Sequence, residues 1–178
     1  MTIAIRPAAA ADLAAIAAIY GEAVATGTAS FELVPPGRAE MTRRFETLRA
    51  GGFPYLVAAD EAGRVLGYAY AGPYRPRAAY GLTVEDAVYV AADARRLGVG
   101  RALLAALVEA ATAAGFRQMI AVIGDSANAG SVGVHAAAGF RMVGTFEAVG
   151  RKHGRWLDTV LMQRSLGDGD TAPPEREP

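Results

Sequence analysis

The sequence predicts a single domain of mixed α/β class with a largely antiparallel sheet. Helical and extended patterns follow one another along most of the chain, and a short hairpin across Asp60–Gly63 joins two extended runs. At 178 residues, of which 52% are hydrophobic, the chain is long enough to bury one sizeable core. The expected domain covers residues 1–166. The tail at 167–178 is rich in proline and charge, so we expect it to be disordered.

Each element follows from the spacing of its apolar residues. In the first helix, Leu13, Ile16, Tyr20 and Val24 form one stripe, and Asp12 occupies the first turn, where the helix dipole favours an anion. The segment near residue 120 is continuously apolar, as in a strand covered on both faces. These patterns predict helices at 10–25, 37–50, 99–114 and 131–138, and strands at 2–6, 54–59, 64–71, 83–90, 118–123, 140–146 and 155–166.

The centre of the chain predicts a phosphate-binding turn. A strand at Thr83–Val90, rich in Val, Thr and Tyr, is followed by the basic turn Arg95-x-x-Gly98-x-Gly100 and then by a helix. A helix start offers unused backbone N–H groups and a partial positive charge, and glycine lets an anion approach them. A P-loop would need Lys and then Ser or Thr after Gly100, and a dinucleotide fold would need glycine at Leu103. A solvated basic helix start would carry the same residues as a phosphate site.

Composition excludes several classes of function. The formal net charge is zero and no run of basic residues is longer than a pair such as Arg95-Arg96, which argues against nucleic-acid binding. Charges or glycines interrupt every apolar run, so we expect no membrane span, and the N-terminal residues do not resemble a signal peptide, which predicts a cytoplasmic location. The chain has no cysteine, so we expect no disulfide, no thiolate metal site and no cysteine-bound acyl intermediate. No metal is expected as a cofactor.

Five segments resemble the GNAT N-acetyltransferases. The turn Arg95–Gly100 matches the acyl-CoA signature [QR]-x-x-G-x-[GA], and Asn128-x-x-Ser131 followed by Gly139-Phe140 is similar to the second half of that family's CoA site. The segments 69–75, 80–90 and 154–158 resemble one branch, the phosphinothricin and methionine sulfoximine or sulfone N-acetyltransferases. The resemblance runs from about Ile3 to Leu166, although Leu82 stands where the family usually carries Trp.

The resemblance implies a GNAT fold, in which a mostly antiparallel sheet with helices on both faces splays open between the strands at 83–90 and 118–123. Acetyl-CoA, the implied co-substrate, would wedge into this gap. Its pantetheine amides would pair with the free edge of one strand, as an added strand would. The implied cofactor-binding residues are Val88, Tyr89 and Val90 for the pantetheine, Arg95, Arg96, Leu97, Gly98, Val99, Gly100 and Arg101 for the pyrophosphate, and Asn128 and Ser131 on the other side.

Two residues are candidates for proton transfer. Glu85 and Asp86 point to opposite faces of a strand, so we expect only one of them to serve the cleft. The resemblance selects Glu85 as the general base, because a carboxylate in a partly desolvated cleft has a raised pKa; a merely solvated glutamate is the alternative. His135 would protonate the departing thiolate or order a water, unless it only packs near the cofactor. Tyr89 is the other conceivable acid, and a backbone N–H near Val90 would meet the oxyanion.

The acceptor is expected to bind in loops. Arg75 is the choice implied by the resemblance for an amino-acid carboxylate, with Arg77 as its rival, and Phe31 and Glu32 would border the acceptor pocket. We expect Trp156 in the core or in the interface of a homodimer, and His153 at the surface or in the acceptor cleft.

The implied activity is direct transfer of acetyl from acetyl-CoA to the α-amino group of a small amino acid or analogue. The alternatives are another amine, such as a protein N-terminus or a polyamine, and a non-catalytic acyl-CoA-binding domain. No nucleic acid or membrane is expected as a partner.

Overall fold

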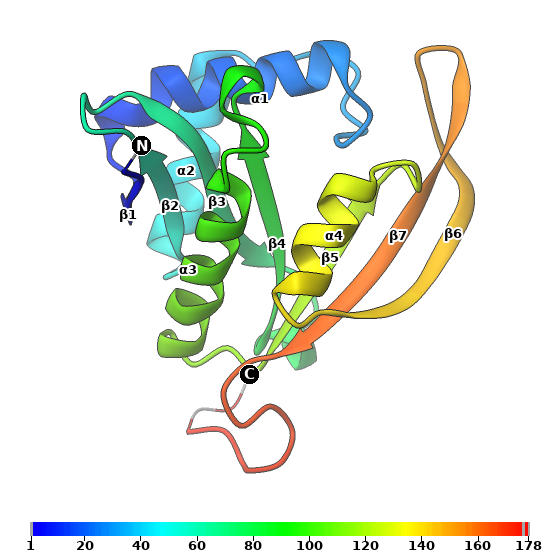
Figure 1. The fold of residues 1–178 in the computed structure, drawn as a ribbon. Coiled ribbons are helices and arrows are strands. Elements are labelled where there is room, and N and C mark those ends of the chain that lie inside the picture. The colour runs from blue at the N-terminus through cyan, green and yellow to red at the C-terminus, as the bar shows by residue number, and fades with distance from the viewer. Residues whose placement is uncertain (1, 176, 178) are drawn as a thin grey trace.

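The computed structural model describes residues 2–175 and 177, and within them seven strands form one sheet (Figure 1). Their order across the sheet is β1-β2-β3-β4-β5-β7-β6, and every neighbouring pair is antiparallel except β4 and β5. The predicted mixed, mostly antiparallel class is therefore confirmed. The strands are β1 Ala4–Pro7, β2 Tyr55–Ala59, β3 Val65–Pro73, β4 Thr83–Val90, β5 Gln118–Gly124, β6 Arg141–Lys152 and β7 Arg155–Ser165.

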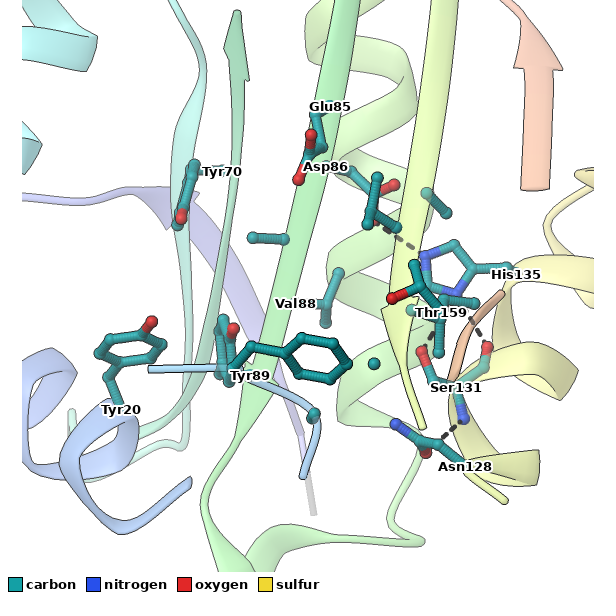
Figure 2. Close-up of a pocket in the computed structure, with 17 residues that line it drawn as sticks. Tyr20, Tyr70, Glu85, Asp86, Val88, Tyr89, Asn128, Ser131, His135 and Thr159 are labelled. Atoms are coloured by element: carbon teal, nitrogen blue, oxygen red, sulfur yellow. Dashed lines mark hydrogen bonds and ion pairs between the residues drawn. The ribbon is translucent and has the colours of Figure 1, made fainter. Parts of the chain in front are cut away.

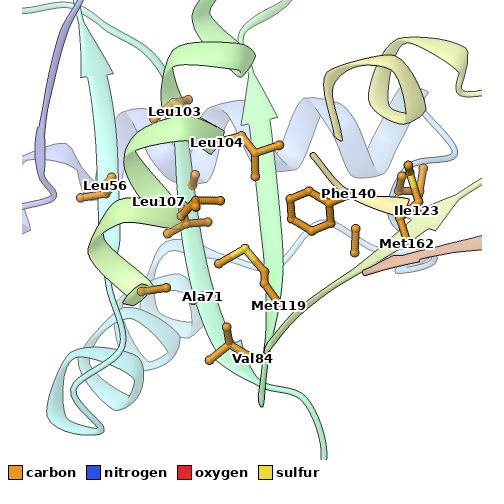
Figure 3. Close-up of a cluster of buried hydrophobic side chains, with 14 of the residues drawn as sticks. Leu56, Ala71, Val84, Leu103, Leu104, Leu107, Met119, Ile123, Phe140 and Met162 are labelled. Carbon is orange, nitrogen blue, oxygen red and sulfur yellow. The ribbon is translucent and has the colours of Figure 1, made fainter. Parts of the chain in front are cut away.

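Helices cover both faces of the sheet, as the resemblance implied. Side chains alternate along β2, so Leu56 and Ala58 join the core beneath one helix, α3, whereas Tyr55 and Val57 join the core beneath α1 and α2. Figure 3 shows the first of these cores, with leucines of α3 above β3, β4 and β5. The helices are α1 Leu13–Thr26, α2 Arg38–Ala50, α3 Val99–Ala113 and α4 Ala129–Ala137, with 3₁₀ turns at Ala10–Asp12, Ala78–Tyr80 and Ala92–Ala94.

The sheet opens at its centre. Strand β4 pairs with β5 only from Thr83 to Asp86, opposite Gln118–Ala121. Beyond Asp86, β4 continues beside β3 to Val90, whereas β5 continues beside β7 to Gly124. Each of the two strands thus keeps one paired edge after they part, and the implied splay lies where the sequence placed it.

The hairpin of β6 and β7 is longer than the sequence predicted. The sequence predicts that the first of these strands ends at 146, but β6 runs to Lys152, with register shifts between Met142 and Gly144 and between Phe146 and Gly150. Bulges absorb the extra residues, with Ala148 left-handed at φ of +53°, and the glycines at 144 and 150 look like turn signals in the sequence. Trp156 of β7 is 64% exposed, so of the two places expected for it, the core and a dimer interface, the core is wrong.

Part of the tail expected to be disordered packs against the domain. The guanidinium of Arg117 donates to the carbonyl of Gly169 at 2.8 Å and also to that of Ala172. Leu166, just before the tail, is fully buried. The sequence could not reveal this contact, because it depends on one arginine that is distant in sequence and on backbone carbonyls. Of the predicted tail, residues 176 and 178 lie outside the described residues.

The loop between α1 and α2 is docked onto the open end of β5. Thr28 donates from its hydroxyl to Asp125 at 2.7 Å, and Lys152 donates from Nζ to the carbonyl of Ser30 at 2.8 Å. A Cβ atom added at Gly124 would lie 2.6 Å from the carbonyl oxygen of Ala29. The loop can therefore lie this close to β5 only because residue 124 has no side chain.

We predict that Gly124→Ala loosens this loop and destabilises the fold by about 1–3 kcal/mol, because the clash is with backbone that cannot move aside cheaply. Gly133→Ala in α4 is the matched control: nothing lies within 4 Å of its added Cβ, and alanine favours a helix, so stability should be unchanged or higher. Denaturant titration of both variants measures the difference. Equal midpoints for the two variants would contradict the tight docking.

Candidate functional site

A cavity of about 330 Å³ lies where β4 and β5 part. Figure 2 shows side chains from β4, α1 and α4 converging on it. The α1–α2 loop closes one side with Phe31. The residues proposed from sequence that line this cavity are Phe31, Glu85, Val88, Tyr89, Asn128, Ser131 and His135. The fold therefore brings together segments that are up to about a hundred residues apart in the sequence.

Glu85 occupies a half-buried position in the wall of this cavity. Burial raises the pKa of its carboxyl group, and the negative charge of Asp86 raises it further, while Arg75 partly opposes both. A carboxylate with a raised pKa is a stronger base than one in water, so this environment suits proton abstraction.

Glu85 and Asp86 also line a second cavity of about 330 Å³, on the side of α2. The expectation that at most one of the two carboxylates serves the cleft stays a prediction. Pairing between β4 and β5 ends at Asp86, and the open space there reaches both faces of β4.

His135 is buried in α4 and is held by two partners. Its Nε2 lies 2.9 Å from Oδ2 of Asp86, and its Nδ1 lies 2.8 Å from the carbonyl oxygen of Ser131. Burial lowers the pKa of the imidazole, but the hydrogen bond and charge of Asp86, with the Ser131 carbonyl, outweigh burial, so the pKa is raised. Sequence reasoning treated Asp86 only as the rival of Glu85 and missed this pairing.

The basic turn has the predicted shape. Gly98 caps α3 with φ of +83°, a left-handed conformation that favours glycine, and Arg96 is also left-handed with φ of +62°. The side chains of Arg95, Arg96 and Arg101 are exposed. Val90 and residues 95–101 do not line the cavity between β4 and β5. These residues follow the last part of β4 in the chain and lead into α3. A ligand that extends from the cavity to the start of α3 would therefore meet the unused N–H groups of its first turn.

Asn128 begins α4 as its cap. Its side-chain oxygen accepts from the backbone N–H of Ser131 at 3.2 Å. The amide nitrogen of Asn128 is then the group suited to contact a ligand in the cavity that this residue lines.

The residues predicted to bind the acceptor separate into two groups. Phe31 lines the cavity, and its ring packs so tightly on Gly150 that an added Cβ there would lie 2.2 Å from it. Glu32 instead forms an ion pair with Arg44 at 2.6 Å and accepts a hydrogen bond from the Tyr20 hydroxyl at 2.8 Å. These contacts tie the α1–α2 loop to both helices.

Arg75 and Arg77 are both exposed and line neither cavity. The Arg75 guanidinium lies 4.6 Å above the Tyr74 ring, and its positive charge lowers the pKa of the Glu85 carboxyl.

Several lining residues were missed from sequence. Tyr20 and Tyr70 border both cavities, and Thr159 borders the first. Tyr20 belongs to the apolar stripe of α1, so its sequence signal was that of a core residue. Burial raises the pKa of Tyr70 to about 12, so its hydroxyl remains protonated and can donate a hydrogen bond.

His153 is exposed in the β6–β7 turn, with Nε2 3.3 Å from the carbonyl oxygen of Gly27. Among the described residues no group of three histidine, cysteine or acidic side chains could hold a metal ion. Across residues 2–175 and 177, no helix is long and apolar enough to cross a membrane.

Comparison with known proteins identifies the family. The acetyltransferase (GNAT) domain matches residues 5–161. A phosphinothricin N-acetyltransferase from Alcaligenes faecalis is 55% identical over 92% of this chain and 83% of its own length. An L-methionine sulfoximine/L-methionine sulfone acetyltransferase from Pseudomonas aeruginosa is 45% identical over 97% of this chain and its whole length.

A solved structure shares the fold closely. The phosphinothricin acetyltransferase from Sinorhizobium meliloti, described in complex with AcCoA, has a TM-score of 0.96 and 51% identity, covering 99% of this chain and 95% of that one. The parted strands, the glycine-capped turn and the matched domain agree with one another, and the chain belongs to the GNAT family of acetyltransferases.

Proposed function

We propose that this enzyme transfers the acetyl group of acetyl-CoA to the α-amino group of a small amino acid or analogue, with Glu85 as general base. Glu85 carries the proposal: it is a half-buried carboxylate of raised pKa in a cavity at the parting of β4 and β5. Relatives that act on phosphinothricin and on methionine sulfoximine or sulfone support this class of acceptor.

The chemistry requires a base because an amine is protonated at neutral pH and cannot attack a carbonyl. Glu85 would take a proton from the ammonium, directly or through a water, and the free amine would attack the thioester carbon. The C–N bond forms first, and the tetrahedral intermediate then collapses as the C–S bond breaks and the CoA thiolate leaves. The nitrogen gives up its second proton, which reaches the thiolate through solvent, so the products are the amide and CoA. The chain has no cysteine, which is consistent with direct transfer. Acetylation removes the charge of the amine, and we propose that it detoxifies such compounds in the cytoplasm, where acetyl-CoA is available.

We predict that Glu85→Gln lowers kcat by about 100-fold or more, the usual contribution of a positioned base, while acetyl-CoA still binds. In the unmodified enzyme, kcat/KM should fall as pH falls through the raised pKa of Glu85, because only the carboxylate can accept a proton. Glu109→Gln, an exposed glutamate of α3, is the matched control. Steady-state kinetics with phosphinothricin and methionine sulfoximine, and calorimetry with acetyl-CoA, provide the readouts. Full activity of the Glu85 variant would remove the proposed base.

We propose Arg75 as the residue that binds the acceptor carboxylate, and Phe31, which lines the cavity, as a wall of the acceptor pocket. The charge of Arg75 lowers the pKa of the Glu85 carboxyl, which supports this role. Its position in the exposed loop after β3 leaves the guanidinium accessible to a substrate.

We predict that Arg75→Gln raises the KM of the amino-acid acceptor by about 10- to 100-fold, the loss expected for a charge-assisted hydrogen bond. The acidic limb of kcat/KM should also move to higher pH, because the cation that lowers the pKa of Glu85 is gone. Arg77→Gln, from the same loop, should change neither quantity. If the two variants have the same KM for the acceptor, Arg75 does not bind the acceptor carboxylate.

We also propose a homodimer formed through the β6–β7 hairpin. Large apolar side chains are exposed along these strands, which is unusual unless another surface covers them. They are Met142, Val143, Phe146, Val149 and Trp156.

We predict that the enzyme sediments as twice the chain mass of 18.4 kDa and that Trp156→Glu shifts it towards the monomer, because a charge cannot be buried there without a partner. Val34→Glu, at an exposed apolar residue of the α1–α2 loop, is the control. Sedimentation velocity distinguishes the two forms. A monomeric parent enzyme at micromolar concentration would contradict the proposal.

A further inference from the structure

A buried pair of side chains ties α4 to the point where the sheet opens. Asp86 is the last residue of β4 that pairs with β5, and its carboxylate meets the imidazole of His135 at 2.9 Å (Figure 2). The two residues are only 7% and 4% exposed. They lie 49 positions apart in the chain, so their contact fixes the distance between β4 and α4 across one side of the cavity.

The second contact of the imidazole determines where its hydrogens lie. Nδ1 of His135 is 2.8 Å from the carbonyl oxygen of Ser131, and a carbonyl can only accept, so Nδ1 carries a hydrogen. The Ser131 hydroxyl lies farther away, at 3.4 Å. Nε2 then shares the remaining hydrogen with Oδ2 of Asp86. Both ring nitrogens are therefore occupied, and His135 cannot release a proton to another group without breaking a buried hydrogen bond.

We propose that Asp86 is a positioning residue, which acts through His135 to hold α4 against the parted end of β4. Asn128 and Ser131, the residues of this region implied in cofactor binding, lie in the first turn of the same short helix. The pair thereby sets the width of the acetyl-CoA cleft. His135 is a fixed part of its wall and not the acid that protonates the departing thiolate. This inference rests on the proposed function for the identity of the ligand, but its geometry does not depend on turnover.

Nothing else that packs on His135 replaces the charge of Asp86. From the segment after α4, Phe140 presents its ring edge-on at a centroid distance of 5.1 Å. From α4 itself come the carbonyl and hydroxyl of Ser131, and Thr159 of β7 lines the same cavity with a neutral hydroxyl. Among the described residues, Asp86 is the charged group in contact with the ring. Glu85, its chain neighbour, lines the same cavity as a second carboxylate.

The pair also predicts that the affinity for acetyl-CoA depends on pH. Because the pKa of His135 is raised, the imidazolium–carboxylate pair exists below that raised pKa and is lost as pH rises through it. The affinity for acetyl-CoA should therefore weaken on the alkaline side, without any requirement for an acid in the chemical step.

The test compares Asp86→Ala, Asp86→Asn, His135→Ala and the double alanine variant, with the exposed Asp168→Asn as control. Asparagine keeps a hydrogen bond, since its amide can donate to a neutral Nε2, but it removes the charge. We expect the alanine variants to raise the Kd and KM for acetyl-CoA by about 10- to 100-fold, with kcat at saturation within a few-fold of the parent. The double variant should be no worse than either single one, because the two residues act as a unit.

The asparagine variant provides the readout that a merely structural role would not move. Its acetyl-CoA affinity should recover towards that of the parent, while NMR of the labelled imidazole should show a neutral ring with hydrogen on Nδ1 and a lowered His135 pKa. Affinity and NMR need no acceptor, so they decide the inference even if no amine is acetylated. If the alanine variants do not fold, the pH dependence decides it: the parent should lose acetyl-CoA affinity as pH rises through the raised pKa of His135, and the asparagine variant should not.

The inference is overturned if His135→Ala loses kcat at saturating acetyl-CoA while the Asp86 variants keep it, since His135 would then be the acid. It is also overturned if acetyl-CoA affinity is unchanged in every variant, or if the imidazole of the parent enzyme titrates like a free histidine.

Discussion

The end of pairing between β4 and β5 is the constraint on which the site depends. Two parallel strands pair over four residues and then part, each retained by its other neighbour. Backbone polar groups left without a partner inside a protein are costly. The parted edge is therefore tolerated only beside open space, and it offers ready-made hydrogen-bonding groups to an extended ligand. Glu85 and Asp86 stand at the end of the paired region, so the chemistry proposed here lies where the backbone opens.

Three separate contacts keep this gap open and in register. On one side, α3 starts from a left-handed glycine that follows the C-terminal end of β4, and its leucines pack into the core between α3 and the sheet. On the other side, the Asp86–His135 pair anchors α4. Across the mouth, the α1–α2 loop rests on Gly124, where a side chain would collide with its backbone. The site is thus assembled from rigid elements, which suits a reaction that needs two substrates held in one orientation.

Much of this arrangement could be predicted from the sequence, because its signals are local. The strand at Thr83–Val90 and the glycine turn after it depend on nearby residues, and Arg95, Gly98 and Gly100 also carry the family resemblance. The elements that the sequence missed depend on distant contacts. Nothing local in the sequence indicates the pairing of Asp86, because its partner His135 lies in α4. Tyr20 belongs to the apolar stripe of α1, which indicates a core residue, and only the fold shows that it also lines the cavity. The bulged strand β6 was cut short since its glycines mimic a turn.

The central claim is that the main chain of β4 beyond Asp86, together with the first turn of α3, forms the surface that binds acetyl-CoA. Amide hydrogen exchange with and without acetyl-CoA tests it most directly, because it reports backbone hydrogen bonds residue by residue. The account predicts slower exchange at Val88–Val90 and at residues 96–101 on adding the ligand, and unchanged exchange along the tail at 167–175. Binding that leaves the amides of β4 and α3 unprotected would contradict it.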